Sequence, residues 1–188
     1  MSVRSERRRD CARVEARVPA VVRSAKREAA TICWGDEMGL RSDHVTGTRY
    51  RLVGRTSVVR ATGQRFGCSM ISAITNRGQL VIRVFHGTFC APMFVDFMRR
   101  LRRQSVGKVY LIFDGHPTHR SKLAKAFVAA SPADFRLIRL PVYCPELNPD
   151  ELLNQDMKTN ALGKSRPRTR DEMMASVRRH LFRRQKQP

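Results

Sequence analysis

Three acidic residues stand where apolar segments end or a helix begins, and such positions suit metal-dependent chemistry. Asp36 closes the segment TICWGD, and Asp114 closes the apolar run KVYLIFD. Glu151 falls in the first turn of a helix that should start at Asn148 and Pro149, a good N-cap and a good first helical residue. Three carboxylates brought together can hold two divalent ions about 4 Å apart for phosphoryl transfer. Mg²⁺ is the expected ion, because it prefers oxygen ligands.

Each acid also has a plainer interpretation. Asp36 could be an exposed turn residue, and Asp114 could cap the helix expected over residues 121–130. Asp150 and Glu151 could simply complement the dipole of their helix. The residues alone leave these alternatives open.

Three neighbouring side chains bear on the same acids. Glu37 follows Asp36 directly, so strand alternation sends it to the opposite face of the sheet. His116 and His119 follow Asp114 in the sequence GHPTH. Each histidine could orient Asp114, contact a phosphate, or be an ordinary loop or capping residue.

The composition indicates a partner of opposite charge. The chain has 188 residues with 37 Lys+Arg against 16 Asp+Glu, a formal net charge of +21. A domain this basic points to a polyanion, most simply nucleic acid. No run of about 18 apolar residues is present, so no membrane span is expected. The five cysteines lack CxxC spacing, which favours a reducing cytoplasm over a zinc or disulfide framework.

Alternating and periodic patterns predict a mixed α/β chain. Residues 66–75 and 79–86 should form a hairpin around Asn-Arg-Gly, because such a turn suits tight strand connections. Further strands are expected at 31–36, 108–114 and 135–140, and helices at 19–29, 91–104, 121–130 and 171–184. We expect the first strand to end at Asp36, with Gly39 turning the chain away.

The helix that starts at Pro149 should be amphipathic. Its apolar stripe is predicted to contain Leu152, Leu153 and Met157. The other side is predicted to contain Glu151, Asn154, Gln155 and Lys158. The chain then divides into a basic helical segment (1–28), a catalytic domain (29–163) and a basic linker and helix (164–188).

The segments WGDEMGL, YLIFDGHPTHRS and LPVYCPELNPDELLNQDMK resemble the three acidic motifs of DDE-superfamily transposases. The nearest group is the bacterial insertion-sequence transposases related to the mariner elements. The third segment, with Tyr-x-Pro-x-Leu-Asn-Pro-x-Glu, is the most specific. The resemblance implies that Asp36, Asp114 and Glu151, rather than Asp150, are the catalytic and metal-binding triad. The interval between Asp114 and Glu151 is close to the spacing that the family shows.

The resemblance also implies an α/β RNase H-like fold. Its mixed five-stranded sheet would have three antiparallel strands followed by two parallel ones, with helices on both faces. The implied activity is two-metal cleavage at the ends of an insertion sequence, followed by strand transfer. The implied cofactor is two Mg²⁺ ions, for which Mn²⁺ can substitute.

The implied partners are terminal inverted repeats and target DNA, both double-stranded. A homodimer would act on that DNA in the bacterial cytoplasm, at the nucleoid, and a separately encoded helix-turn-helix part could recognise the repeats. We predict phosphate contacts from basic residues near the site and in the linker, namely His119, Arg120, Lys158, Lys164, Arg166 and Arg168.

Two other functions also agree with these residues. A metal-dependent nuclease of RNase H-like fold would cut DNA without joining ends. A non-catalytic remnant of a transposase would bind DNA through its charge alone. An Asp36→Ala exchange separates the enzymes from the remnant, because only the enzymes lose an activity.

Overall fold

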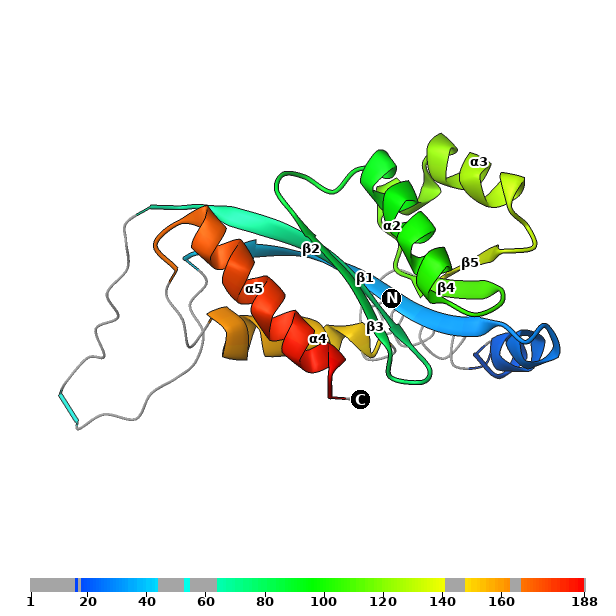
Figure 1. Ribbon diagram of the computed structural model, residues 1–188, viewed down its shortest axis with the longest axis horizontal. Coiled ribbons are helices and arrows are strands. Elements are labelled where there is room, and N and C mark those ends of the chain that lie inside the picture. Colours follow the sequence, from blue (N-terminus) through cyan, green and yellow to red (C-terminus); the bar gives the residue numbers. More distant parts are fainter. Residues whose placement is uncertain are drawn as a thin grey trace, which may run out of the picture.

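The computed structural model describes residue 16 and residues 18–43, 53–54, 64–140, 148–162 and 167–187. Five strands form one sheet in the order β3-β2-β1-β4-β5 (Figure 1). The strands are β1 (Thr31–Arg41), β2 (Gly67–Thr75), β3 (Leu80–Phe85), β4 (Val109–Phe113) and β5 (Phe135–Arg139). Strands β1 to β3 are antiparallel, whereas β4 pairs in parallel with both β1 and β5. The predicted mixed sheet is therefore confirmed.

Helices cover both faces of the sheet, as predicted. One face carries α2 (Ala91–Gln104) and α3 (Lys122–Ala130), with the short 3₁₀ helix η1 (Pro117–Arg120) between β4 and α3. The other face carries α4 (Asp150–Asp156), the π-helical turn η3 (Met157–Leu162), α5 (Arg170–Gln185) and a helix over residues 18–27 (Figure 1). No helix in the described part of the chain is long and apolar enough to cross a membrane.

Strand alternation divides the core between the two faces. Leu111 packs with α2 residues such as Phe94 and Met98 on one side. Met70 packs with Met157 and other residues of α4, η3 and α5 on the opposite side. Strand β4 is buried along its whole length, which explains why its sequence is continuously apolar.

Helix α5 closes the far edge of the sheet. Its residues Met173, Val177 and Leu181 are fully buried in the core against β2 and β3. Arg178 Nη2 donates a hydrogen bond to the Val84 carbonyl over 3.4 Å, and Gln185 Nε2 donates one to the Leu80 carbonyl over 2.7 Å. Both carbonyls belong to the edge strand β3, so α5 satisfies polar groups that no neighbouring strand reaches.

Strand β1 differs from the prediction. It runs for 11 residues, so Asp36 lies near its middle and Gly39 continues the strand. The parallel pairing with β4 ends at Trp34 opposite Ile112, but the antiparallel pairing with β2 continues to Arg41 opposite Gly67. Strand β2 therefore keeps β1 extended beyond the point where β4 leaves it.

Helix α4 is also rotated relative to the prediction. Leu152 is 71% exposed, whereas Asn154 is buried. The buried face consists of Asp150, Leu153, Asn154 and Met157, which follow one another at helical spacing. Two polar residues thus replace Leu152 on the buried side, and both of them contact the region around Asp36.

Candidate functional site

The fold places the three predicted acids near the end of the β1–β4 pairing, but the triad is not among the described groups whose ligand atoms lie within 4.8 Å of one another. The parallel pairing of β1 with β4 ends where Trp34 lies opposite Ile112. Asp36 on β1 and Asp114 after β4 follow shortly beyond this pair. Asn148, at the start of α4, donates from Nδ2 to the carbonyl of Gly35 over 3.4 Å. This bond ties the beginning of α4 to β1, immediately beside Asp36.

The negative charges of other carboxylates act on Asp36. Its Oδ2 accepts a hydrogen bond from Asn154 Nδ2 over 2.7 Å, and its Oδ1 accepts one from the Glu37 N–H over 2.9 Å. Burial, followed by the negative charges of Glu37, Glu151 and Asp114, raises the pKa of Asp36 to about 7. A divalent cation would relieve this excess of negative charge, so the donor set fits a hard metal ion.

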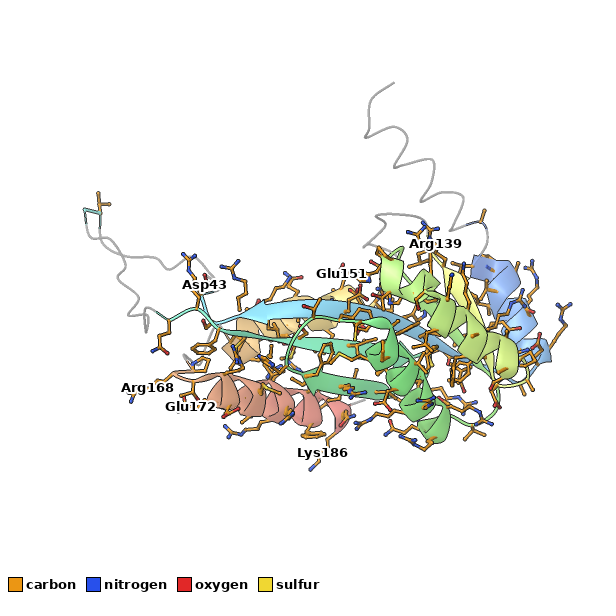
Figure 2. All side chains as sticks on the ribbon, turned by 90° about the horizontal axis from the view of Figure 1, so that it is seen from above. Asp43, Arg139, Glu151, Arg168, Glu172 and Lys186 are labelled. Carbon is orange, nitrogen blue, oxygen red and sulfur yellow. The ribbon has the colours of Figure 1, made fainter. Side chains whose placement is uncertain are left out.

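The two adjacent acids of α4 have different environments. Asp150 is completely buried, and its Oδ2 accepts a hydrogen bond from Ser72 Oγ over 2.8 Å. Burial raises the pKa of Asp150 well above its usual value. Glu151 is exposed (Figure 2), yet its charge acts on Asp36. Asp150 therefore anchors α4 to β2, and Glu151 is the acid that solvent and ligands can reach.

Asp114 is held through one of its two oxygens. Its Oδ1 accepts a hydrogen bond from the His116 N–H over 3.0 Å and lies 3.4 Å from His119 Nδ1. The contact with His119 lowers the pKa of Asp114, and this effect outweighs burial. The side chain is 48% exposed. Asp114 is thus an ionised carboxylate whose Oδ2 makes neither of these contacts.

His119 lies behind Asp114 and also meets Glu37. Its Nε2 is 3.3 Å from Glu37 Oε2, on the face of β1 opposite to Asp36, as alternation predicts. Burial alone lowers the pKa of His119, but the contacts with Asp114 and Glu37 raise it to about 9. Among the described residues, one ligand atom from each of Glu37, Asp114 and His119 lies within 4.8 Å of the other two.

The burial of His119 corrects one of its predicted roles. The residue is only 3% exposed and packs against the rings of Phe94 and Phe113, so a phosphate in bound DNA cannot reach it. Orientation of Asp114, the alternative that the sequence left open, agrees with its position.

The other predicted phosphate contacts are placed only in part. Arg120 in η1 and Arg168 before α5 are exposed, and Lys158 in η3 is partly exposed. Lys164 and Arg166 lie outside the described residues. These positions permit contact with DNA, and the contacts themselves stay a prediction.

Several polar residues of the site were not predicted from the sequence. Asn148 and Asn154 bond to Gly35 and Asp36, and Ser72 bonds to Asp150. A partial signal was available, because Asn154 lies three residues after Glu151 and therefore on a neighbouring part of the helix.

The sheet order and the acids on β1, after β4 and on α4 define an RNase H-like fold. The sequence profile of the DDE superfamily endonucleases matches residues 31–174, and the chain belongs to this family. No curated protein matches the chain.

Solved structures of Mos1 transposase have the same fold. The mariner Mos1 paired end complex with Mg matches with a TM-score of 0.62 and 20% identity, over 97% of this chain and 55% of that chain. The Mos1 strand transfer complex matches with a TM-score of 0.61 and 18% identity, over 97% of this chain and 53% of that one.

The Mos1 catalytic domain itself is covered more fully. Its structure with raltegravir and Mg matches with a TM-score of 0.59 and 14% identity, over 100% of this chain and 85% of that one. By contrast, this chain spans 53% to 62% of the Mos1 chains in the strand transfer complex and the paired end complex with Mn. The shared part is therefore the catalytic fold.

Proposed function

We propose that this chain is the catalytic domain of a transposase, which cuts DNA at the ends of a mobile element and joins them to target DNA. The supporting observation is the placement of Asp36 and Asp114 just beyond the β1–β4 pairing, beside α4, which Asn154 and the preceding Asn148 tie to β1. Burial and the charges of Glu37, Glu151 and Asp114 also raise the pKa of Asp36. Membership in the DDE endonuclease superfamily agrees with that chemistry.

Asp36, Asp114 and Glu151 would hold the metal. When bound, two Mg²⁺ ions, or Mn²⁺ in their place, activate the attacking oxygen and stabilise the leaving oxygen of an in-line displacement. Asn154 fixes Oδ2 of Asp36 by its hydrogen bond, and the His116 N–H fixes Oδ1 of Asp114. These two hydrogen bonds would fix the orientation of two of the proposed metal ligands.

The proposed substrate is double-stranded DNA, both terminal repeat and target. The net charge of +21 favours binding to phosphates, with Arg120, Lys158, Lys164, Arg166 and Arg168 as proposed contacts. A homodimer would act on two ends together, since the Mos1 structures include paired end complexes. A helix-turn-helix part encoded separately would recognise the repeats.

Calorimetric titration with Mn²⁺ and a plasmid-nicking assay with Mg²⁺ test this function. Wild-type protein should bind metal and nick supercoiled DNA, and Glu151→Gln should lose both properties because it removes an exposed ligand. Joining of precut ends to a target would separate a transposase from a nuclease that only cuts.

Asp150→Asn is the matched control for Glu151→Gln. The exchange is nearly isosteric, and the burial of Asp150 already favours its neutral form. Metal affinity should therefore persist. Loss of metal binding in Asp150→Asn, with retention in Glu151→Gln, would transfer the ligand role to Asp150. Absence of metal binding and nicking in the wild type would indicate that the chain is a non-catalytic, DNA-binding remnant of a transposase.

A further inference from the structure

The imidazole of His119 connects two carboxylates from different parts of the fold. Nε2 lies 3.3 Å from Glu37 Oε2 on β1, and Nδ1 lies 3.4 Å from Asp114 Oδ1 after β4. Each ring nitrogen therefore faces one carboxylate oxygen, and both polar atoms of the ring are directed at an acid. Contacts on both nitrogens fit a residue that orients the two acids relative to each other.

The surroundings hold this bridge in one orientation. The ring of His119 is 3% exposed, and the rings of Phe89, Phe94 and Phe113 have centroids 5.6, 4.6 and 4.4 Å from its own. The Glu37 side chain is only 15% exposed. Close packing on several sides prevents the imidazole from turning away from its partners.

We propose that Glu37 and His119 form a positioning pair that fixes the Asp114 carboxylate against β1 and leaves its Oδ2 for a divalent ion. This inference rests on the proposed function. It adds Glu37, the neighbour of Asp36, to the residues on which metal binding depends, although Glu37 faces the opposite side of the sheet from Asp36.

Mn²⁺ affinity of Glu37→Gln, His119→Gln and the double variant tests the pair. Loss of a residue that orients a metal ligand typically weakens metal binding by about 10- to 100-fold. Each single variant should lose affinity in that range. The double variant should lose little more, because either exchange already breaks the bridge.

Phe127→Leu serves as the matched control, since Phe127 packs against the same core, on Phe135, and makes no ring contact with His119 among the described residues. Its Mn²⁺ affinity should match the wild type, with thermal unfolding in EDTA recorded for all variants. Wild-type affinity in folded Glu37→Gln and His119→Gln, or losses that add independently, would overturn the pair. No Mn²⁺ binding by the wild type would instead refute the metal centre on which the pair depends.

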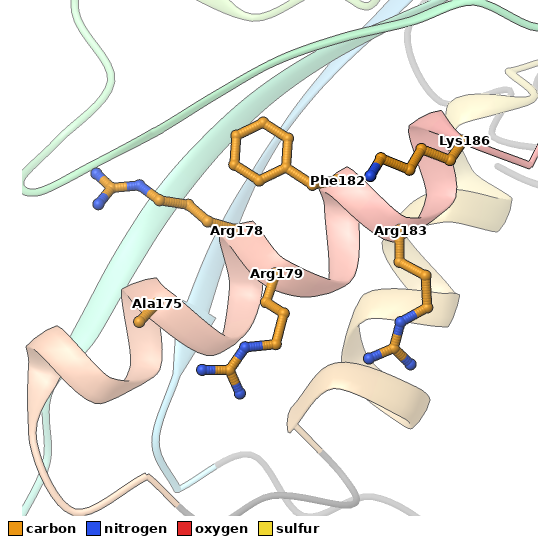
Figure 3. Close-up of a pocket in the computed structure, with 6 residues that line it drawn as sticks. All are labelled: Ala175, Arg178, Arg179, Phe182, Arg183 and Lys186. Carbon is orange, nitrogen blue, oxygen red and sulfur yellow. The ribbon is translucent and has the colours of Figure 1, made fainter.

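A second observation concerns the outer face of α5. A hollow there is lined by Ala175, Arg178, Arg179, Phe182, Arg183 and Lys186 (Figure 3). Some basic residues of this helix have partners within the protein. Arg184 pairs with Asp156, and Arg178 donates a hydrogen bond to the Val84 carbonyl. No acidic side chain among the described residues pairs with Arg179, Arg183 or Lys186.

This surface lies away from the catalytic acids. Glu151 and Lys186 project from opposite long sides of the molecule in Figure 2. Phe182 lies among these cations and is 50% exposed. Hydration of a charged surface does not explain an exposed aromatic ring at this position. A row of unpaired cations around a hollow is complementary to a chain of phosphates.

We infer that Arg179, Arg183 and Lys186 bind the backbone of a duplex DNA segment other than the one at the carboxylates. This inference also rests on the proposed function, in which two DNA molecules must be held together. Phosphate contacts predict binding without sequence preference and with a strong dependence on salt.

Fluorescence anisotropy with a labelled duplex of arbitrary sequence tests the surface across a range of salt concentrations. The triple variant Arg179→Gln, Arg183→Gln, Lys186→Gln should lower the slope of log affinity against log salt by about 2 to 3, since each contact contributes about 0.9. Mn²⁺ affinity should stay at the wild-type value, because the carboxylates are untouched.

The triple variant Arg103→Gln, Lys122→Gln, Lys125→Gln is the matched control. It removes the same charge from exposed positions on α2 and α3, on the opposite face of the sheet. Equal slopes for the two triple variants would show that only total charge matters and would overturn the surface. Wild-type protein that binds no duplex would refute the proposed DNA substrate itself.

Discussion

Two histidine–carboxylate clusters lie on opposite faces of the sheet, and they differ in how completely their charges are balanced. Asp156 accepts hydrogen bonds from Asn160 and Arg184 and lies 2.6 Å from His180 Nε2. Burial alone would raise the pKa of Asp156, but Arg184, His180 and Asn160 hold it far below its usual value. Every charge in this cluster has a partner.

In the cluster around His119, by contrast, the negative charges outnumber the positive ones. One imidazole lies between Glu37 and Asp114, and the adjacent Asp36 has no cation of its own among the described residues. The pKa of Asp36 accordingly rises to about 7, whereas that of Asp156 falls. The paired cluster stabilises the fold, whereas the unpaired negative charge near His119 lowers stability, and the proposed metal ions would neutralise it.

The substitution Asp36→Asn should have the largest effect on this difference between the two clusters. We expect nicking to fall by more than about 100-fold, because loss of a ligand should exceed the effect of losing its supporting residues. In EDTA at pH 8 the same variant should be more stable than the wild type by about 1–2 kcal/mol, since an unfavourable buried charge has gone. Urea unfolding followed by circular dichroism measures the gain. A loss of stability in EDTA would refute the charge excess.

Asp156→Asn should have the reverse outcome. Removal of one partner leaves His180 and Arg184 without their acid, and unfolding free energy should fall by about 2–3 kcal/mol at pH 7. Mn²⁺ affinity measured below the unfolding transition should be unchanged. Weaker metal binding in the folded variant would mean that the two clusters are coupled through the sheet.

The two acids should also give opposite pH dependences in EDTA. Asp156 has a lowered folded pKa, so its stabilisation is present above its unfolded pKa of about 3.9 and is lost as pH falls below it. Asp36 has a raised folded pKa, so its contribution is full at low pH and is lost as pH rises through about 7. The unfolding free energy of each Asn variant, subtracted from that of the wild type at each pH, gives the contribution of the replaced acid and the sign of its pH dependence. Differences of equal sign would contradict the contrast.

The smallest expected effect concerns two buried thiols, one in each core. Cys33 lies on the α2 face and Cys68 on the α5 face, and burial raises their pKa values to about 12 and about 11. Both should label slowly. Asp156→Asn should raise the ratio of Cys68 to Cys33 labelling, because it loosens the α5 face first. Peptide mass spectrometry after timed alkylation measures this ratio, and an unchanged ratio would indicate that both faces open together.

Much of the fold could be predicted from local sequence patterns. The hairpin of β2 and β3, helix α2 and the buried strand β4 have simple signals in turn residues, helical spacing and continuous apolar residues. The length of β1 could not be predicted, because Asp36 and Glu37 interrupt its apolar pattern. Its continuation depends on pairing with β2, which is distant in sequence.

The candidate site was predictable only to the level of its acids. Asp36 and Asp114 stand out in the sequence because acids are scarce there. The Glu37–His119 contact joins residues that are far apart in sequence and needs the parallel register of β1 and β4. The burial of Asn154 depends on how α4 rotates against the sheet, which the helical pattern left ambiguous.

The covered edge of β3 has a consequence for solubility. An uncovered edge strand presents free carbonyl and N–H groups, and strands of other molecules can pair with them. The side chains of Arg178 and Gln185 already occupy the carbonyls of Val84 and Leu80. The last helix thereby protects the molecule from edge-to-edge aggregation. A chain that lacked this helix would keep Asp36, Asp114 and Glu151 and yet be prone to assemble into insoluble β-structure.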